Sequence, residues 1–202
     1  MSTKLPRFCV YCGSSPGARP EYTAAARQLG QTLARRKIEL VYGGGNVGLM
    51  GEIARAVVDA GGRVIGVIPR DLADKEVAYK ELADLRLVNN MHERKALMVK
   101  LSDGFIALPG GFGTFEEFFE VVTWTQLGFQ RKPCGLLNVG QYYNSLIKFL
   151  DHAVAEQFMR PEYRAIVLVD ENIDTLLGKL ETYEPPTIDK AEIAKALSKR
   201  NK

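Results

Sequence analysis

The sequence predicts an α/β fold in which a doubly wound, mostly parallel sheet carries helices on both of its faces. Short apolar runs typical of buried strands alternate along the chain with longer amphipathic runs typical of helices. Three strand-like runs end directly in glycine-bearing loops, at residues 13–17, 43–48 and 110–113. Such alternation implies crossover helices between parallel strands, with ligands bound beyond the carboxyl ends of the strands.

Each expected element rests on a local pattern, and together they form one Rossmann-like domain. Strands are expected at residues 7–12, 38–42, 63–68, 85–88, 104–108, 134–138 and 165–169, which are short apolar runs. Helices are expected at residues 21–36, 49–60, 93–102, 114–127, 142–156 and 173–180, where apolar residues recur at helical spacing. We expect a single domain over residues 1–181 and a basic C-terminal tail over residues 182–202, which contain Pro185 and Pro186.

Composition excludes several functional classes. The net charge is only +3, and no basic stripe interleaves with aromatic residues, so we expect no nucleic-acid partner. No apolar run reaches membrane-spanning length and no signal peptide opens the chain, so we expect no membrane partner and a cytoplasmic location. Cys9 and Cys12 are three apart on an expected strand and therefore point to opposite faces. We expect no metal site and no cofactor.

The segment from Leu108 to Glu117 carries the most information about function. An expected buried strand runs through Pro109, Gly110, Gly111 and Gly113 directly into a helix. Glycines allow the backbone to approach an anion closely, and the free amides and dipole of a helix N-terminus attract negative charge. The segment therefore predicts a phosphate-binding cradle, and the domain is expected to bind a nucleotide.

Charged residues beside this cradle suggest chemistry next to the phosphate. Glu116, Glu117 and Glu120 lie on the helix that follows the cradle, and Arg94 and Lys95 lie near the start of the preceding helix. Cations at a helix N-terminus are disfavoured by the helix dipole, and a nearby anion would offset that cost. The alternative for the glutamates is that they are ordinary capping residues in the first turns of a helix. The alternative for Arg94 and Lys95 is a solvated pair on the protein surface.

A second glycine loop has two interpretations. Gly43, Gly45 and Gly48 fit the spacing G-x-G-x-x-G, and Asp71 follows at the distance of a ribose-binding acid. This pattern favours a dinucleotide-binding oxidoreductase as one alternative function. The other interpretation is tight packing of a strand against a helix.

The motifs together resemble those of one family. Met91-x-x-Arg94-Lys95 and Pro109-Gly-Gly-x-Gly-Thr-x-x-Glu117 resemble the signature of the LOG ("lonely guy") phosphoribohydrolases, and the similarity runs from about residue 8 to residue 169. The resemblance implies hydrolysis of the N-glycosidic bond of N6-modified adenosine 5'-monophosphates, with AMP as a further substrate. The products are the free base (a cytokinin) and ribose 5-phosphate. The resemblance also implies a homodimer.

The resemblance assigns roles to individual residues. It implies that Arg94 and Glu117 are catalytic. Nucleotide contacts are expected at Gly44, Gly45, Asp71, Met91, Lys95, Gly110, Gly111, Phe112, Gly113, Thr114, Phe115, Glu116 and Thr123. Glu117 could stabilise ribosyl charge, bind ribose hydroxyls or orient the attacking water, and these roles stay open. A non-catalytic nucleotide-binding protein of the same fold is the remaining alternative.

Overall fold

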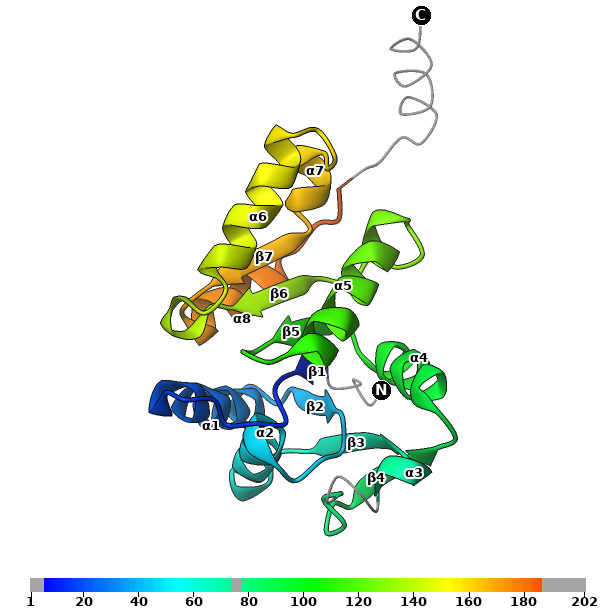
Figure 1. Cartoon of the computed structure of the whole chain (residues 1–202). Helices are drawn as coiled ribbons and strands as arrows, with labels where there is room; N and C mark the ends of the chain where they lie inside the picture. Colours follow the sequence, from blue (N-terminus) through cyan, green and yellow to red (C-terminus); the bar gives the residue numbers. More distant parts are fainter. Residues whose placement is uncertain (1–5, 74–77, 187–202) are drawn as a thin grey trace, which may run out of the picture.

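The sheet organises the molecule. The computed structural model describes residues 6–73 and 78–186. Within this part, seven parallel strands lie in the order β4-β3-β2-β1-β5-β6-β7 (Figure 1). Their bounds are β1 Arg7–Tyr11, β2 Glu39–Tyr42, β3 Val64–Pro69, β4 Asp84–Val88, β5 Gly104–Ala107, β6 Cys134–Leu137 and β7 Val167–Asp170. The expected doubly wound fold is confirmed.

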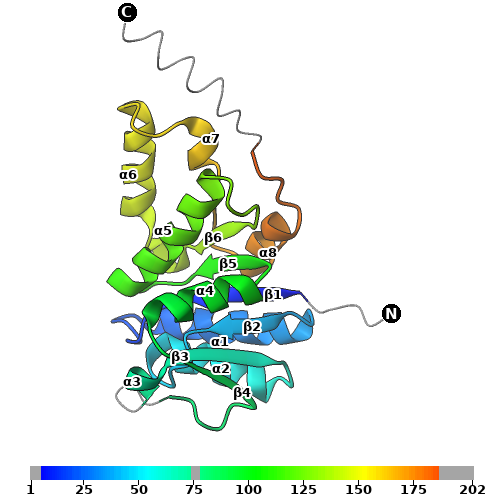
Figure 2. The ribbon, with the colours of Figure 1, turned by 90° about the vertical axis from the view of Figure 1, so that its right-hand side faces the viewer.

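Helices cover both faces of the sheet. The long helices are α1 Pro20–Arg35, α2 Gly48–Asp59, α4 Met91–Leu101, α5 Phe112–Gln126, α6 Asn144–Ala155 and α8 Ile173–Glu181. Helices α1, α2 and α8 pack into one apolar cluster, whereas α4, α5 and α6 pack into the cluster on the other face. In Figure 2, α6 and α8 accordingly lie on opposite sides of β6. Cys9 and Cys12 belong to different clusters, as their spacing predicts.

Three short elements were not expected from the sequence. They are α3 Arg70–Ala73, the 3-10 turn η1 Val139–Gln141 and α7 Pro161–Arg164. Each spans three or four residues, which is too short to show a helical period.

Most of the expected tail, residues 187–202, lies outside the described residues. Across residues 6–73 and 78–186, helices that combine the length and the apolar character needed to cross a bilayer are absent.

The strand order determines where a ligand can bind. Strand β1 pairs with β2 on one side and β5 on the other, with Tyr11 opposite Ala107 at the carboxyl end of the β1–β5 pair. The chain winds outward from β1 to β4, and then α4 returns it to β5 beside β1. This reversal opens a crevice between the loops that follow β1 and β5. The Gly13–Gly17 and Gly110–Gly113 loops therefore face each other there.

Candidate active site

The N-terminus of α5 has the properties of an anion cradle. Gly111 is the N-cap residue, no side chain caps the helix, and its first turn contains no acidic residue. The first bond of the helical ladder joins the Phe115 amide to the Gly111 carbonyl at 3.1 Å. The amides of residues 111–114 therefore have no partner within the helix. These amides and the helix dipole together favour a bound phosphate.

The glycines of this loop serve different structural purposes. A Cβ on Gly110 would overlap the Thr114 side chain and lie 2.9 Å from the Gly13 nitrogen. Gly110 is thus required for close packing against the loop after β1, where the Gly13 amide donates to the Pro109 carbonyl at 3.0 Å. A Cβ on Gly111 or Gly113 would meet nothing within 4 Å. These two glycines leave the space in front of the amides open.

Arg94 is buried and held by backbone carbonyls. The residue is 7% exposed; its Nε donates to the Val67 carbonyl at 3.2 Å, and one Nη donates to the Gly43 carbonyl at 2.9 Å. The other Nη lies 4.0 Å from Glu117 Oε1. A Cβ on Gly43 would overlap the guanidinium, so the glycine makes room for Arg94.

The surroundings of Glu117 place its proton equilibrium near neutrality. Its side chain is only 13% exposed. Burial raises the pKa of Glu117 to about 7, and the Arg94 charge opposes this rise. A carboxyl group with such a pKa can exchange a proton at neutral pH, which is the property that general acid–base catalysis uses. Buried polar pairs with shifted pKa values in a cleft are typical of functional sites.

Lys95 has partners other than a ligand. Its ammonium donates to Glu116 and, at 3.0 Å, to Glu120, so it links α4 to α5. This ion-pair cluster holds the two helices together beside the Arg94–Glu117 pair. Arg94 and Lys95 therefore both have acceptors within the protein, which the sequence alone did not indicate.

The cradle and the Arg94–Glu117 pair line one cleft of about 340 Å³. Eight of the expected site residues line it: Met91, Arg94, Gly111, Phe112, Gly113, Thr114, Glu116 and Glu117. Five further lining residues were not expected: Cys12, Gly13, Ser14, Met50 and Leu72. The glycine loop after the first strand was a usable signal for Gly13 and Ser14. Nothing local in the sequence marks Leu72.

Other expected contacts lie outside this lining. The Gly44 carbonyl accepts from the Tyr79 amide at 3.0 Å, and Gly45 forms a bridge with Ala78, so this part of the second glycine loop packs against its own chain. Asp71 is exposed on α3, and its neighbour Leu72 reaches the cleft instead.

Two expected contacts on α5 also point elsewhere. Phe115 packs edge-on against Tyr143, with ring centroids 6.3 Å apart. Thr123 is exposed and lies six residues beyond Glu117, about 9 Å further along the helix axis. Lys95 is linked to the cleft by its ion pair with Glu116, and Gly110 packs against Thr114 and Gly13, which line the cleft.

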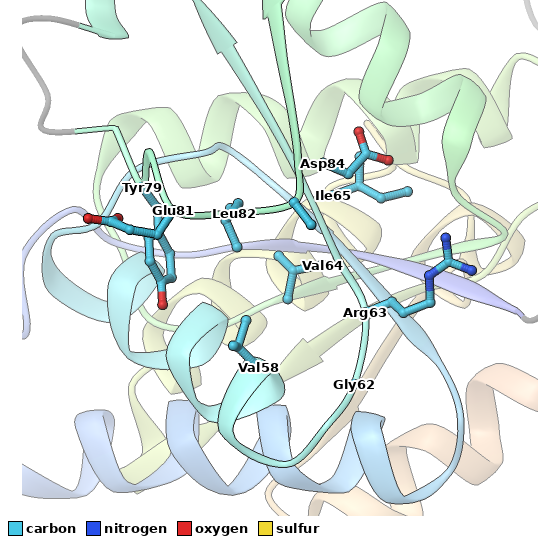
Figure 3. Close-up of a pocket in the computed structure, with 10 residues that line it drawn as sticks. Val58, Gly62, Arg63, Val64, Ile65, Tyr79, Glu81, Leu82 and Asp84 are labelled. Atoms are coloured by element: carbon cyan, nitrogen blue, oxygen red, sulfur yellow. The ribbon is translucent and has the colours of Figure 1, made fainter.

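A larger hollow of about 450 Å³ lies at the opposite end of the sheet (Figure 3). Val58, Val64 and Leu82 form its apolar floor, with Arg63 and Asp84 toward one side. Arg63 pairs with Glu39 at 3.2 Å, and Asp84 pairs with Arg86 at 2.9 Å. Its charged side chains are partly or largely exposed, and it contains no helix N-terminus.

Comparisons with solved structures agree with the fold. A molybdenum cofactor binding protein from Rippkaea orientalis superposes with a TM-score of 0.66 at 23% identity, covering 90% of this chain and 98% of that one. The molybdenum cofactor carrier protein of Chlamydomonas reinhardtii superposes with a TM-score of 0.64 at 20% identity, covering 90% and 100% of the two chains. At these identities the likeness concerns the fold alone.

Sequence comparisons identify the family. A family profile described as "Possible lysine decarboxylase" matches residues 50–180. A probable cytokinin riboside 5'-monophosphate phosphoribohydrolase of Oryza sativa subsp. japonica, LOGL5, is 52% identical over 93% of this chain and 76% of its own length. The cytokinin riboside 5'-monophosphate phosphoribohydrolase LOG7 of Arabidopsis thaliana is 51% identical over 91% of this chain and 84% of its own length. This chain therefore belongs to the LOG phosphoribohydrolase family.

Proposed function

We propose that this protein hydrolyses the N-glycosidic bond of cytokinin riboside 5'-monophosphates and releases the free base and ribose 5-phosphate. The observation that carries the proposal is the pairing of Arg94 with the buried Glu117, one turn beyond the uncapped N-terminus of α5. Relatives about half identical over nine-tenths of the chain carry the name of this activity.

We propose a role for the residues around each part of the substrate. The 5'-phosphate binds the free amides of residues 111–114, which places the ribose near Glu117. As the bond between C1' and the base nitrogen breaks, its electron pair leaves with the base and positive charge develops on the ribosyl ring. The Glu117 carboxylate stabilises that charge and accepts a proton from the water that adds to C1'. The departing base nitrogen takes up one proton in turn, so the products are the neutral base and ribose 5-phosphate and Glu117 returns to its carboxylate form.

Arg94 acts on Glu117 rather than on the phosphate. Its guanidinium is fixed by the Gly43 and Val67 carbonyls and directs one nitrogen toward Glu117. The positive charge favours the ionised carboxylate, against the burial that disfavours it. Fixed in this way, Arg94 keeps Glu117 ready to accept a proton at neutral pH.

The apolar part of the cleft suits a modified adenine. Met50, Leu72 and Met91 line the cleft beside the charged pair, and none of them offers a strong hydrogen-bond donor. An apolar N6 substituent would bury surface there, so we propose N6-modified nucleotides as preferred substrates and AMP as a poorer one.

The competing dinucleotide-binding function has little structural support. It rests on the second glycine loop and Asp71, yet Gly44 and Gly45 pair with residues 78–79, and Asp71 is exposed outside the cleft. A carrier without catalysis would not need a buried carboxyl group beside an arginine.

We further propose that the protein acts as a cytoplasmic homodimer. Phe112, at the mouth of the cleft, is 94% exposed, and Phe129 at the far end of α5 is 74% exposed. Burying these side chains against a second copy of the chain would remove apolar surface from water and favour association. Light scattering would test the dimer, and a mass of one chain at micromolar concentration would contradict it.

The activity is tested by product release. Isopentenyladenosine 5'-monophosphate, its unphosphorylated riboside and AMP are incubated separately with the protein, without added metal or nicotinamide, and the free base is measured by chromatography. We expect the monophosphate to react at least 100-fold faster than the riboside, since phosphate binding supports the chemical step. Equal rates on both would contradict the role of the cradle.

A further inference from the structure

We propose that Tyr142 and Tyr143 are positioning residues that fix the backbone of the phosphate cradle from behind. The inference rests on the proposed function for its kinetic consequences, although its binding consequences can be measured separately. It concerns residues of a segment far from the cradle in sequence, after β6.

Three successive carbonyls before α5 each have a defined donor. The Tyr143 hydroxyl donates to the Leu108 carbonyl at 2.6 Å, and the Tyr142 hydroxyl donates to the Gly110 carbonyl at 2.6 Å. Between them, the Gly13 amide donates to the Pro109 carbonyl at 3.0 Å. The chain is thus anchored at every residue between β5 and the N-cap of α5.

Anchoring the carbonyls also fixes the amides. In a trans peptide, the carbonyl of one residue and the N–H of the next lie in one plane and point in opposite directions. Holding the Gly110 carbonyl toward Tyr142 therefore directs the Gly111 N–H away from Tyr142. Because Gly110 and Gly111 have great conformational freedom, this orientation needs an external constraint.

The two tyrosines are themselves held rigidly. The Tyr143 amide donates to Asn138 Oδ1 at 2.7 Å, and the ring of Tyr143 is 1% exposed. The Tyr142 ring packs edge-on against Tyr143 and Tyr22, with centroids 5.0 and 5.8 Å apart. Gly140, between Asn138 and the tyrosines, adopts φ +54, and its carbonyl accepts from Arg19 at 3.1 Å. The hydroxyls therefore have fixed positions behind the cradle.

This arrangement makes phosphate affinity depend on Tyr142. A preformed cradle binds phosphate without first ordering its glycines, which lowers the cost of binding. Tyr142 is 39% exposed, so loss of its hydroxyl leaves the Gly110 carbonyl accessible to water and the fold intact. Tyr143 is buried, and the same change there leaves the Leu108 carbonyl without its donor, so Tyr142 offers the cleaner test.

The experiment compares Tyr142→Phe with the wild type. The variant keeps the ring and removes only the hydroxyl. We expect the dissociation constant for ribose 5-phosphate, measured by calorimetry in phosphate-free buffer, to rise about five- to tenfold. The kcat/KM for the monophosphate should fall by a similar factor, whereas kcat/KM for the unphosphorylated riboside should stay within about twofold. Tyr163→Phe, on α7 away from the cradle, is the matched control and should change neither value.

The outcomes separate this inference from the proposed function. Unchanged ribose 5-phosphate affinity in Tyr142→Phe would overturn the inference even if the wild type is an active hydrolase. Equal losses on monophosphate and riboside would also overturn it, because they indicate a general structural defect. A wild type that releases no base would refute the proposed function, while weaker ribose 5-phosphate binding by Tyr142→Phe would still support the positioning role.

Discussion

Two hollows at opposite ends of the sheet contain carboxylates with opposite pKa shifts. In the hollow of Figure 3, a hydrogen bond from Arg86 lowers the pKa of Asp84. In the cleft, burial raises the pKa of Glu117 to about 7, although Arg94 lies 4.0 Å away. Asp84 forms its ion pair where water still reaches it, with a side chain 39% exposed, whereas Glu117 is 13% exposed.

The difference shows which property identifies the site. The hollow of Figure 3 is larger, at about 450 Å³ against 340 Å³, so volume alone would select the wrong place. The cleft instead combines a buried ion pair, an uncapped helix N-terminus and the reversal of strand order between β1 and β5. Stability does not require a carboxyl group held at an unfavourable pKa, so function is the better explanation for Glu117.

The strongest test of this comparison replaces one carboxylate in each hollow by the corresponding amide. Glu117→Gln should lower kcat by about 1000-fold, because the amide can neither stabilise ribosyl charge nor accept the proton from water. Ribose 5-phosphate affinity should stay within about threefold. Glu81→Gln, at an exposed residue of the other hollow, is the control and should keep wild-type kcat. The rates of base release by the two variants are the measurement. Near-normal turnover by Glu117→Gln would show that Glu117 is a buried helix residue without a catalytic role.

The arginines of the two hollows offer a second test. Arg94→Lys should lower kcat/KM about 100-fold, since one ammonium cannot replace the planar group that reaches two carbonyls and Glu117. Arg63→Lys should change it less than twofold, because its side chain is 74% exposed and only needs to stay near Glu39. Similar losses in both variants would contradict the distinction between the hollows.

The cradle glycines allow a third and smaller test. Gly113→Ala adds a Cβ that meets no protein atom within 4 Å, so the fold should be unaffected while the methyl group occupies space in front of the amides. We expect KM for the monophosphate to rise about tenfold. Gly178→Ala in α8, which also meets nothing within 4 Å, should leave KM unchanged. An unchanged KM in Gly113→Ala would mean that the phosphate lies elsewhere.

Most of the fold could be predicted from the sequence because its evidence is local. All seven strands and the six long helices follow from alternating apolar patterns, with ends that differ by a few residues. The order of the strands could not be predicted in this way, since it depends on which apolar faces pack together in three dimensions. That order brings Ser14, after β1, next to Gly111, after β5.

The candidate site was predictable where its residues lie close together in sequence. The cradle and Glu117 lie within one strand-to-helix connection, and Arg94 lies on the preceding helix. The need for glycine at position 43 was not predictable. It arises because the guanidinium of Arg94, on α4, lies against this position, and not because a ligand does. The same limit applies to Lys95, whose carboxylate partners on α5 are near only after α4 and α5 pack.

The smallest expected effect concerns stability, and it tests the pKa of Glu117 without catalysis. The pKa rises from 4.5 in the unfolded chain to about 7 in the folded one, so between these values the folded state binds more protons. The contribution of Glu117 to the free energy of unfolding should therefore be fully present below pH 4.5 and decrease as pH rises through 7, by about 1 kcal/mol per pH unit. Glu117→Gln cannot titrate, so relative to wild type it should become progressively more stable between pH 5 and pH 7, with no further change above. Urea unfolding at several pH values measures this difference.

The exposed Glu81→Gln should give a curve parallel to wild type. If Glu117→Gln also gives a parallel curve, Glu117 is solvated like the carboxylates of the other hollow, and the contrast between the two hollows disappears.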